Sequence, residues 1–141
     1  MQLAISKLDK LLREMSPRLA EGEYFMACVP ESKMMSLLGC LDSIMCVYRE
    51  EEGLSIVFSA EMGEKMGGLS GGDVAGPFAL ISLEVNSDLF AVGFLAKVTE
   101  ALANAGISVN AFSAYYHDHL LVPYGKREEA MAALGELSAK N

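Results

Sequence analysis

The sequence has few of the features that mark specialised protein classes. Its three cysteines, Cys28, Cys40 and Cys46, form no close pair, and an odd count at irregular spacing favours neither a disulfide framework nor a zinc ribbon. No apolar run reaches the ~18 residues that a membrane span needs. The N-terminus also lacks the long apolar stretch of a secretory signal. We therefore expect a cytoplasmic protein with no membrane partner.

Basic residues are scarce as well, with 11 against 19 acidic residues and a formal net charge of −8. A nucleic-acid-binding protein needs cations clustered on one face to displace counterions from phosphates. Here the few cations are interleaved with acids. The balance argues against nucleic acid as a partner and, weakly, for neutral, zwitterionic or cationic ligands.

The glycine-rich segment 60–76 lacks the Lys-Ser or Lys-Thr pair that follows the last glycine of a phosphate-binding loop. A proline and a strand-like run follow instead. We expect this segment to be a flexible connector rather than a phosphate site.

The first half of the chain alternates helix-like and strand-like patterns. Residues 3–15 have apolar side chains at helical spacing. Residues 24–29 and 44–48 are apolar on both parities, which is typical of strands covered on both faces. Residues 54–59 alternate, as a half-buried antiparallel strand does, so 44–59 predicts a hairpin.

The second half predicts the order strand, helix, strand, strand, helix, over residues 78–85, 91–105, 107–116, 120–122 and from 124 onward. Gly106 stands at the usual left-handed position after a helix. Such an order packs helices on one face of an antiparallel sheet, so the predicted fold class is α+β. The expected core residues are Ala79, Ile81, Leu83, Val85, Leu95, Val98, Leu102, Ala130, Met131, Leu134 and Leu137.

The only two histidines, His117 and His119, flank Asp118. On a straight strand their side chains would point the same way, but stable zinc sites need three or four protein ligands. Asp118 tolerates turn conformations and can bond its neighbouring backbone. We therefore favour a hairpin corner, at a subunit interface or elsewhere, over a metal or catalytic site, and we assign no metal ligand, catalytic residue or cofactor.

Three segments together resemble the ACT-domain superfamily. They are residues 85–96, which read VNSDLFAVGFLA, residues 105–110, which read AGISVN, and residues 115–119, which read YYHDH. More narrowly, the chain is similar to small bacterial and archaeal proteins of unassigned function that consist of two ACT domains. The similarity extends over nearly the whole chain, and the YYHDH run is its most specific element.

The resemblance implies two ferredoxin-like βαββαβ modules, which we place at residues 1–70 and 77–141. The second module has no obvious strand after its last helix, so we expect the strand at 24–29 to supply one, interleaving the modules as in aspartokinase regulatory regions. ACT modules commonly bind amino acids and regulate an attached or partner enzyme. The resemblance therefore implies a non-catalytic regulatory protein with an amino acid as its ligand.

ACT ligands often sit where the first strand of a module turns into its first helix. The candidate ligand-binding residues here are Asp88, Leu89, Ala91, Val92, Gly93, Phe94 and Asn110. Free amides at the helix start can receive a carboxylate. Asp88 either caps the helix or meets an ammonium group, Gly93 serves either close packing or ligand approach, and Asn110 makes either a ligand contact or an edge hydrogen bond.

Three functional hypotheses follow. The first is the ligand-binding regulator, which we expect to be a homodimer because a helix end alone binds too weakly. The second is a protein-interaction module without a ligand, which the nine methionines would suit. The third is an enzyme with a metal site built around His117 and His119.

Overall fold

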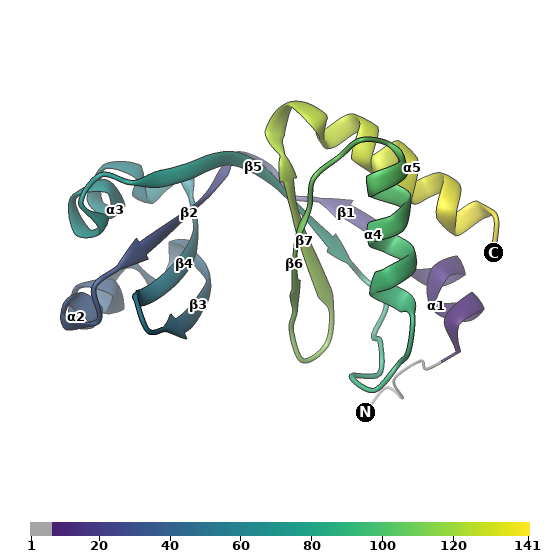
Figure 1. The fold of residues 1–141 in the computed structure, drawn as a ribbon, viewed down its shortest axis with the longest axis horizontal. Coiled ribbons are helices and arrows are strands. Elements are labelled where there is room, and N and C mark those ends of the chain that lie inside the picture. The colour runs from purple at the N-terminus through teal and green to yellow at the C-terminus, as the bar shows by residue number, and fades with distance from the viewer. Residues whose placement is uncertain (1–6) are drawn as a thin grey trace. The chain divides into compact units, whose positions relative to one another are not determined.

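The computed structural model describes residues 7–141, which form two compact units. One unit contains the described residues up to Glu21 together with residues 79–141, and the other contains residues 22–78 (Figure 1). None of the helices in the described part of the chain has the length and apolarity of a membrane span.

The unit of residues 22–78 has the ferredoxin-like order of strands and helices. Its sheet order is β3–β4–β2–β5, with antiparallel pairing of β3 with β4 and of β2 with both β4 and β5. Its elements are β2 (Tyr24–Val29), the helical turns η1 (Glu31–Lys33), α2 (Met34–Leu37) and η2 (Leu38–Ser43), β3 (Ile44–Glu50), β4 (Gly53–Ser59), η3 (Ala60–Met62), α3 (Gly63–Ser70) and the first residues of β5 (Val74–Leu83).

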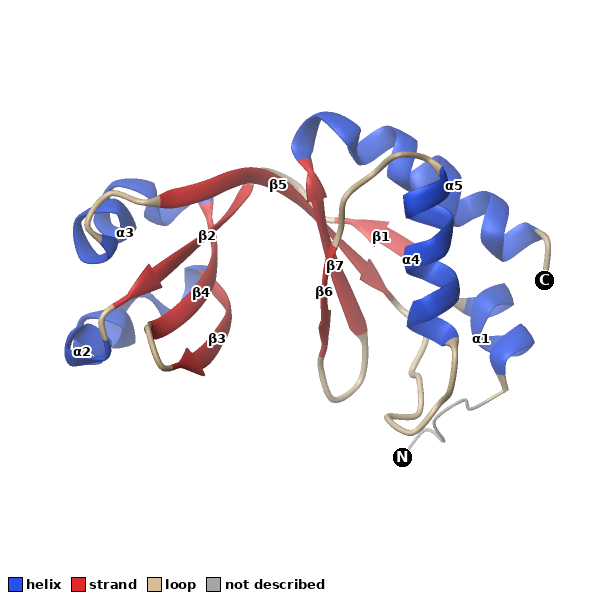
Figure 2. Cartoon of the chain, in the orientation of Figure 1, coloured by secondary structure: helices blue, strands red, loops and turns tan. Residues whose placement is uncertain are grey.

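The other unit repeats this strand order as β6–β7–β5–β1. Its helices gather on one side of these strands (Figure 2). Its elements are α1 (Leu8–Glu14), β1 (Pro17–Leu19), the last residues of β5, α4 (Phe94–Asn104), β6 (Asn110–Ser113), β7 (Asp118–Pro123), η4 (Tyr124–Lys126) and α5 (Arg127–Ala139). The predicted fold class, two α+β ferredoxin-like modules, is confirmed.

The strand that completes this second sheet is not the expected one. Tyr24–Val29 pairs with β4 and with residues 74–78 of β5, inside its own unit. The completing strand is β1, in which Pro17 pairs with Leu83 and Leu19 with Ile81. The chain before residue 22 therefore belongs with residues 79–141, whereas we expected it in the first module.

Packing of α1 explains why the N-terminal segment joins this unit. Leu11, Leu12 and Met15 are at most 2% exposed and belong to the same core as Val98 of α4 and Leu134 of α5. The expected helix at 3–15 is confirmed from Leu8 onward, and its first residues lie outside those described. Since burying a large apolar side chain stabilises by about 1.5–3 kcal/mol, α1 anchors β1 at the sheet edge.

The sheet face that carries the core was predicted correctly. Ala79, Ile81, Leu83 and Val85 alternate along β5 and beyond, and all are buried against the helices. Val98, Leu102, Ala130 and Leu134 are fully buried, while Leu95, Met131 and Leu137 pack at the border of this core. Gly106 has a φ of 74°, as its place after α4 predicted.

The expected flexible connector at 60–76 is instead mostly helical. The segment forms η3 and α3, and Met62 and Met66 enter the core of their unit at 5% and 0% exposure. The glycines misled the prediction because they lie on the open side, where a Cβ at Gly63, Gly67 or Gly68 would meet nothing within 4 Å.

The hairpin at 44–59 is confirmed, but the burial of its strands differs from the prediction. β3 is an edge strand, and Met45, Val47 and Tyr48 on it are 44–68% exposed. β4 is a central strand, and Val57 on its supposedly open face is 3% exposed. Apolar residues at both the odd and the even positions of a strand therefore did not indicate that both of its faces are buried.

His117 lies at a hairpin corner, as predicted, but Asp118 and His119 belong to the paired strand β7. The turn is closed by a bond from the Ala114 amide to the His117 carbonyl, and Asp118 pairs with Ser113 inside the ladder. Neighbouring residues of a strand point to opposite faces, so Asp118 and His119 have different surroundings. The paired strand continues only from Asn110 to Ser113, shorter than the predicted 107–116.

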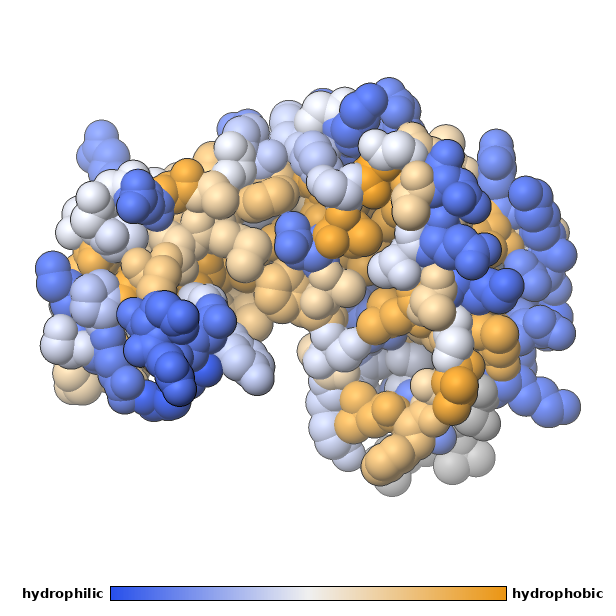
Figure 3. Space-filling view, viewed as in Figure 1, coloured by the Kyte–Doolittle hydropathy of each residue, from blue (hydrophilic) through white to orange (hydrophobic). Residues whose placement is uncertain are grey.

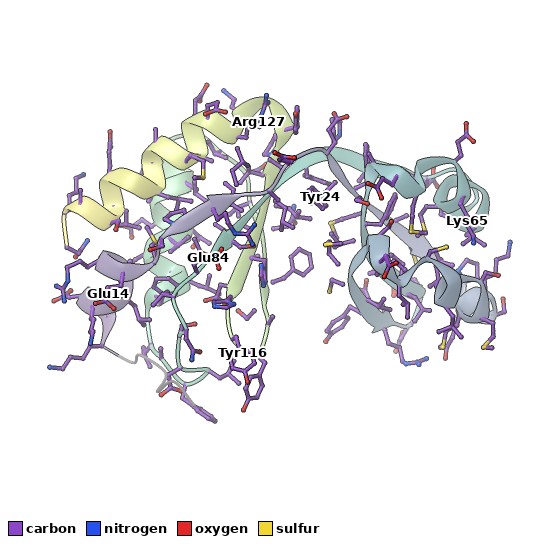
Figure 4. All side chains as sticks on the ribbon, turned by 180° about the vertical axis from the view of Figure 1, so that it is seen from behind. Glu14, Tyr24, Lys65, Glu84, Tyr116 and Arg127 are labelled. Atoms are coloured by element: carbon purple, nitrogen blue, oxygen red, sulfur yellow. The ribbon has the colours of Figure 1, made fainter. Side chains whose placement is uncertain are left out.

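His119 lies on the sheet face away from the helices, where its Nδ1 is 2.8 Å from Ser82 Oγ. Partial burial lowers the pKa of His119, and nearby His117 and Arg18 lower it further against the opposing effect of Asp118 and Glu84. Glu84, which follows β5 (Figure 4), forms an ion pair with Arg18, and this contact lowers the pKa of the carboxyl group.

We predict that Met66→Ala destabilises the unit of residues 22–78 by about 2–5 kcal/mol, because it leaves a cavity in the core. Gly67→Ala, next to it on the open side of the same helix, should stabilise that unit by about 0.5–1 kcal/mol. Urea unfolding followed by circular dichroism measures both changes. A flexible connector would make the two variants indistinguishable from the wild type.

We also predict that the free energy of unfolding falls on acidification from pH 7.5 to 5.5, with a contribution from His119. The unfolded histidine, with a pKa near 6.5, binds a proton before the folded one does, so its contribution is lost as pH drops through that value. His119→Gln should flatten this part of the profile. His117→Gln should raise the pKa of His119 measured by NMR, and a His119 pKa above 6.5 in the wild type would contradict the assignment.

Candidate functional site

The loop between β5 and α4 is held by its own polar groups. The Phe90 amide donates to Asp88 Oδ1 at 2.9 Å, and the Ala91 amide donates to the Asp88 carbonyl at 3.0 Å. Asp88 therefore stabilises a turn within the loop and does not cap α4. Of the two roles considered for this residue, helix capping is excluded by the structure.

Gly93 sets the geometry at the start of α4. It has a φ of 91° at the N-cap position and makes no side-chain cap. A Cβ at this position would lie 3.6 Å from Leu8 Cδ2, so the left-handed φ, more than lack of space, favours glycine. The first amides of a helix have no intrahelical acceptor and carry the positive end of its dipole. The amides of residues 94–96 are thus available to an anionic group.

A cavity of ≈180 Å³ lies beside this helix start. It is smaller than the roughly 300–1,000 Å³ of pockets for drug-sized ligands, so it suits a solute about as large as an amino acid. Its walls come from the loop, from the first turn of α4 and from the β6–β7 hairpin. The lining residues are Ser87, Asp88, Leu89, Ala91, Gly93, Phe94, Leu95, Ala96, Ser113 and Asp118.

Asp118 is the most deeply placed polar group of the cavity, with 7% of its surface exposed. Its Oδ1 accepts a hydrogen bond from Ser113 Oγ at 2.6 Å, and its Oδ2 accepts one from Ser87 Oγ at 3.3 Å. The carboxylate thereby links the loop to the hairpin. A ligand in the cavity would lie beside both this carboxylate and the first turn of α4.

The structure brings together five of the seven residues that sequence reasoning selected, namely Asp88, Leu89, Ala91, Gly93 and Phe94. Val92 does not line the cavity and is 85% exposed. Asn110 lies at the other end of β6 from Ser113, pairs with Leu121 and does not line the cavity either.

Sequence reasoning missed Ser113 and Asp118, although a signal for them existed. Asp118 shares its parity with Leu120 and Val122, which are fully buried, so a polar residue there is on the covered face. Ser113 is its direct partner across the hairpin. The buried Asp118 needs hydrogen-bond donors, and the exposed Ser113 opposite it or a ligand can supply them.

Two other places are weaker candidates. Within residues 7–141 no group of three or more potential metal-ligating side chains comes together, and the His117 and His119 ring centroids lie 6.5 Å apart. A hollow of ≈600 Å³ lies between α1, α4 and α5, but its charged residues, among them Lys97 and Glu136, are all exposed. Neither place combines enclosure with a buried polar group.

Comparison with known proteins supports a specific family. Two family models, each described as an ACT domain, match residues 4–70 and 76–136. No curated protein matches the chain in sequence.

One solved structure is similar in both sequence and fold. It is a protein of unknown function from Vibrio cholerae, described as a possible transport protein, with 38% identity and a TM-score of 0.78 over 93% of this chain and 95% of that one.

Other similar structures share only the fold. The regulatory subunit of aspartate kinase from Thermus thermophilus is 12% identical, with a TM-score of 0.68 over 88% of this chain and 97% of that one. The Thermus flavus counterpart is also 12% identical, with a TM-score of 0.65 over 86% and 95%. From the two family models and the repeated strand order, the chain belongs to the ACT-domain family and carries two ACT domains.

Proposed function

We propose that this protein is a non-catalytic regulator that binds a small amino acid in the cavity beside the start of α4. The observation that carries the proposal is the pairing of a buried carboxylate with free helix amides across ≈180 Å³. An amino acid offers an ammonium group to the first and a carboxylate to the second. Aspartate kinase regulatory subunits have this fold, which supports a regulatory role.

The energetics require several contacts at once. A helix end contributes about 0.3–1 kcal/mol in exposed settings, and a hydrogen bond to a charged group contributes about 1.5–3 kcal/mol. Sensing at ~1 µM to 1 mM needs about 4–8 kcal/mol. The ammonium contact at Asp118, the helix amides and burial of the ligand side chain against Leu89 and Phe94 together reach this range.

Exclusion of water strengthens such contacts, and the rim of the cavity offers a way to achieve it. Leu89, Phe90 and Val92 are 58%, 89% and 85% exposed, and apolar residues are visible at the end of this unit (Figure 3). We infer that the protein is a homodimer in which this rim is covered. The regulated enzyme is then a separate partner that responds to the liganded form.

A specific observation also favours the second function, a protein-interaction module. Met35, Leu38 and Leu41, on the helical turns of the other unit, are 74%, 53% and 56% exposed. Exposed apolar clusters of this kind mark interaction sites. A protein bound at this cluster would be the partner that ligand binding regulates.

We predict that at least one of the twenty amino acids, at 10 mM, raises the melting temperature by a few degrees. A ligand with a Kd near 1 mM would stabilise by about 1.4 kcal/mol at this concentration. Differential scanning fluorimetry measures the shift, and failure of all twenty would contradict the proposal.

A matched pair of variants locates the site. Ala96 lines the cavity at the first turn of α4, whereas Ala103 is exposed further along the same helix and lines no part of it. Ala96→Met should fill the cavity and abolish the ligand-induced shift. Ala103→Met should retain it, and equal shifts in both variants would place the ligand elsewhere.

A further inference from the structure

The Asp118 carboxylate has no cationic partner in the described part of the chain. The ion pairs there are Arg18–Glu84, Arg49–Glu31 and Lys126–Glu129, and none includes Asp118. Its two hydrogen bonds come from serine hydroxyls, one to each oxygen. A carboxylate has about four acceptor sites, so half of its capacity is left for another donor.

Burial makes this unpaired charge significant. A carboxylate removed from water is stable only when it is paired or fully hydrogen-bonded. Two neutral hydroxyls orient the group but bring no positive charge. The nearest open space is the cavity itself, which Asp118 lines. A cation that paired with this carboxylate would therefore reach it through the cavity.

The other residues that line the cavity also favour a cationic group. None of the ten residues that line the cavity is basic, and Asp88 adds a second carboxylate at the rim. One oxygen of Asp88 already accepts the Phe90 amide. The positive end of the α4 dipole corresponds to about half an elementary charge, so it only partly offsets two carboxylates.

We propose that Asp118 is the specificity-determining residue of this site and that it selects ligands by an ammonium group. This proposal rests on the proposed function for the location of the site. Amines and basic or neutral amino acids bind there, whereas acids without an ammonium group do not. Ser87 and Ser113 act as positioning residues, because they fix both carboxylate oxygens.

Four probes that share the same aliphatic chain beyond the α-carbon, lysine with an added ε-ammonium, test the ammonium requirement by titration calorimetry at low salt. They are L-lysine, L-norleucine, hexanoate, which is norleucine without its ammonium, and n-pentylamine, which is norleucine without its carboxylate. We expect L-lysine, L-norleucine and n-pentylamine to bind and hexanoate to fail. Hexanoate binding as tightly as norleucine would overturn the inference while leaving an amino-acid site in place.

Asp118→Asn tests the residue itself. The side-chain carbonyl of Asn still accepts a serine hydroxyl, but the charge is gone. Affinity for the three ammonium probes should fall about 10- to 100-fold, the value of a charged hydrogen bond. The exposed Asp42→Asn, in the other unit, removes the same charge and should leave all affinities unchanged.

A purely structural role for Asp118 gives different results. In that case Asp118→Asn would lower the melting temperature of the free protein and leave the ranking of the probes unchanged. We expect the free variant to melt at or above the wild-type temperature, because an unpaired buried charge has been removed. Ser113→Ala keeps the charge and should keep the preference for ammonium probes.

The wild-type ranking stands as a test even if Asp118→Asn does not fold. Failure of all four probes on the wild type overturns the inference. The screen of twenty amino acids then decides the proposed function separately.

Discussion

The pairing of β1 with β5 is the constraint on which the unit with the candidate site depends. Three residue pairs, Pro17 with Leu83, Arg18 with Ser82 and Leu19 with Ile81, close the edge of its sheet. The same short strand holds α1 over α4 and α5, where its apolar side chains complete the core. The end of β5 is thereby fixed, and the loop that forms the cavity wall starts from a rigid strand end.

Neighbouring residues of β7 point to opposite faces of the sheet and so have different surroundings. Asp118 faces the covered side of the sheet and joins the cavity, while His119 faces the open side and contacts Ser82. A shift of the hairpin register by one residue would exchange these surroundings. The turn at residues 114–117 therefore fixes the site as well as the hairpin.

The sequence predicted elements wherever local pattern and tertiary burial agree, as at Ile81, Val98 and Leu134. It failed where packing overrides local preference. Glycines in α3 hid a helix whose Met66 enters the core, and apolar residues at both odd and even positions could not reveal that β3 is an edge strand. The sequence did not predict the position of Asp118, because an aspartate near a hairpin corner fits either the turn or a buried strand position. Only the strand register distinguishes the two.

The cavity walls suggest how binding could be sensed. Ser87 belongs to the loop, Ala96 to α4 and Ser113 to the hairpin, so one small solute in the cavity would contact three segments. A ligand that holds an ammonium at Asp118 and a carboxylate at the helix amides would tie these segments together. Phe90 and Val92 lie in the same loop and are exposed. A ligand that held this loop, as proposed above, would change how that apolar rim meets a second protein surface.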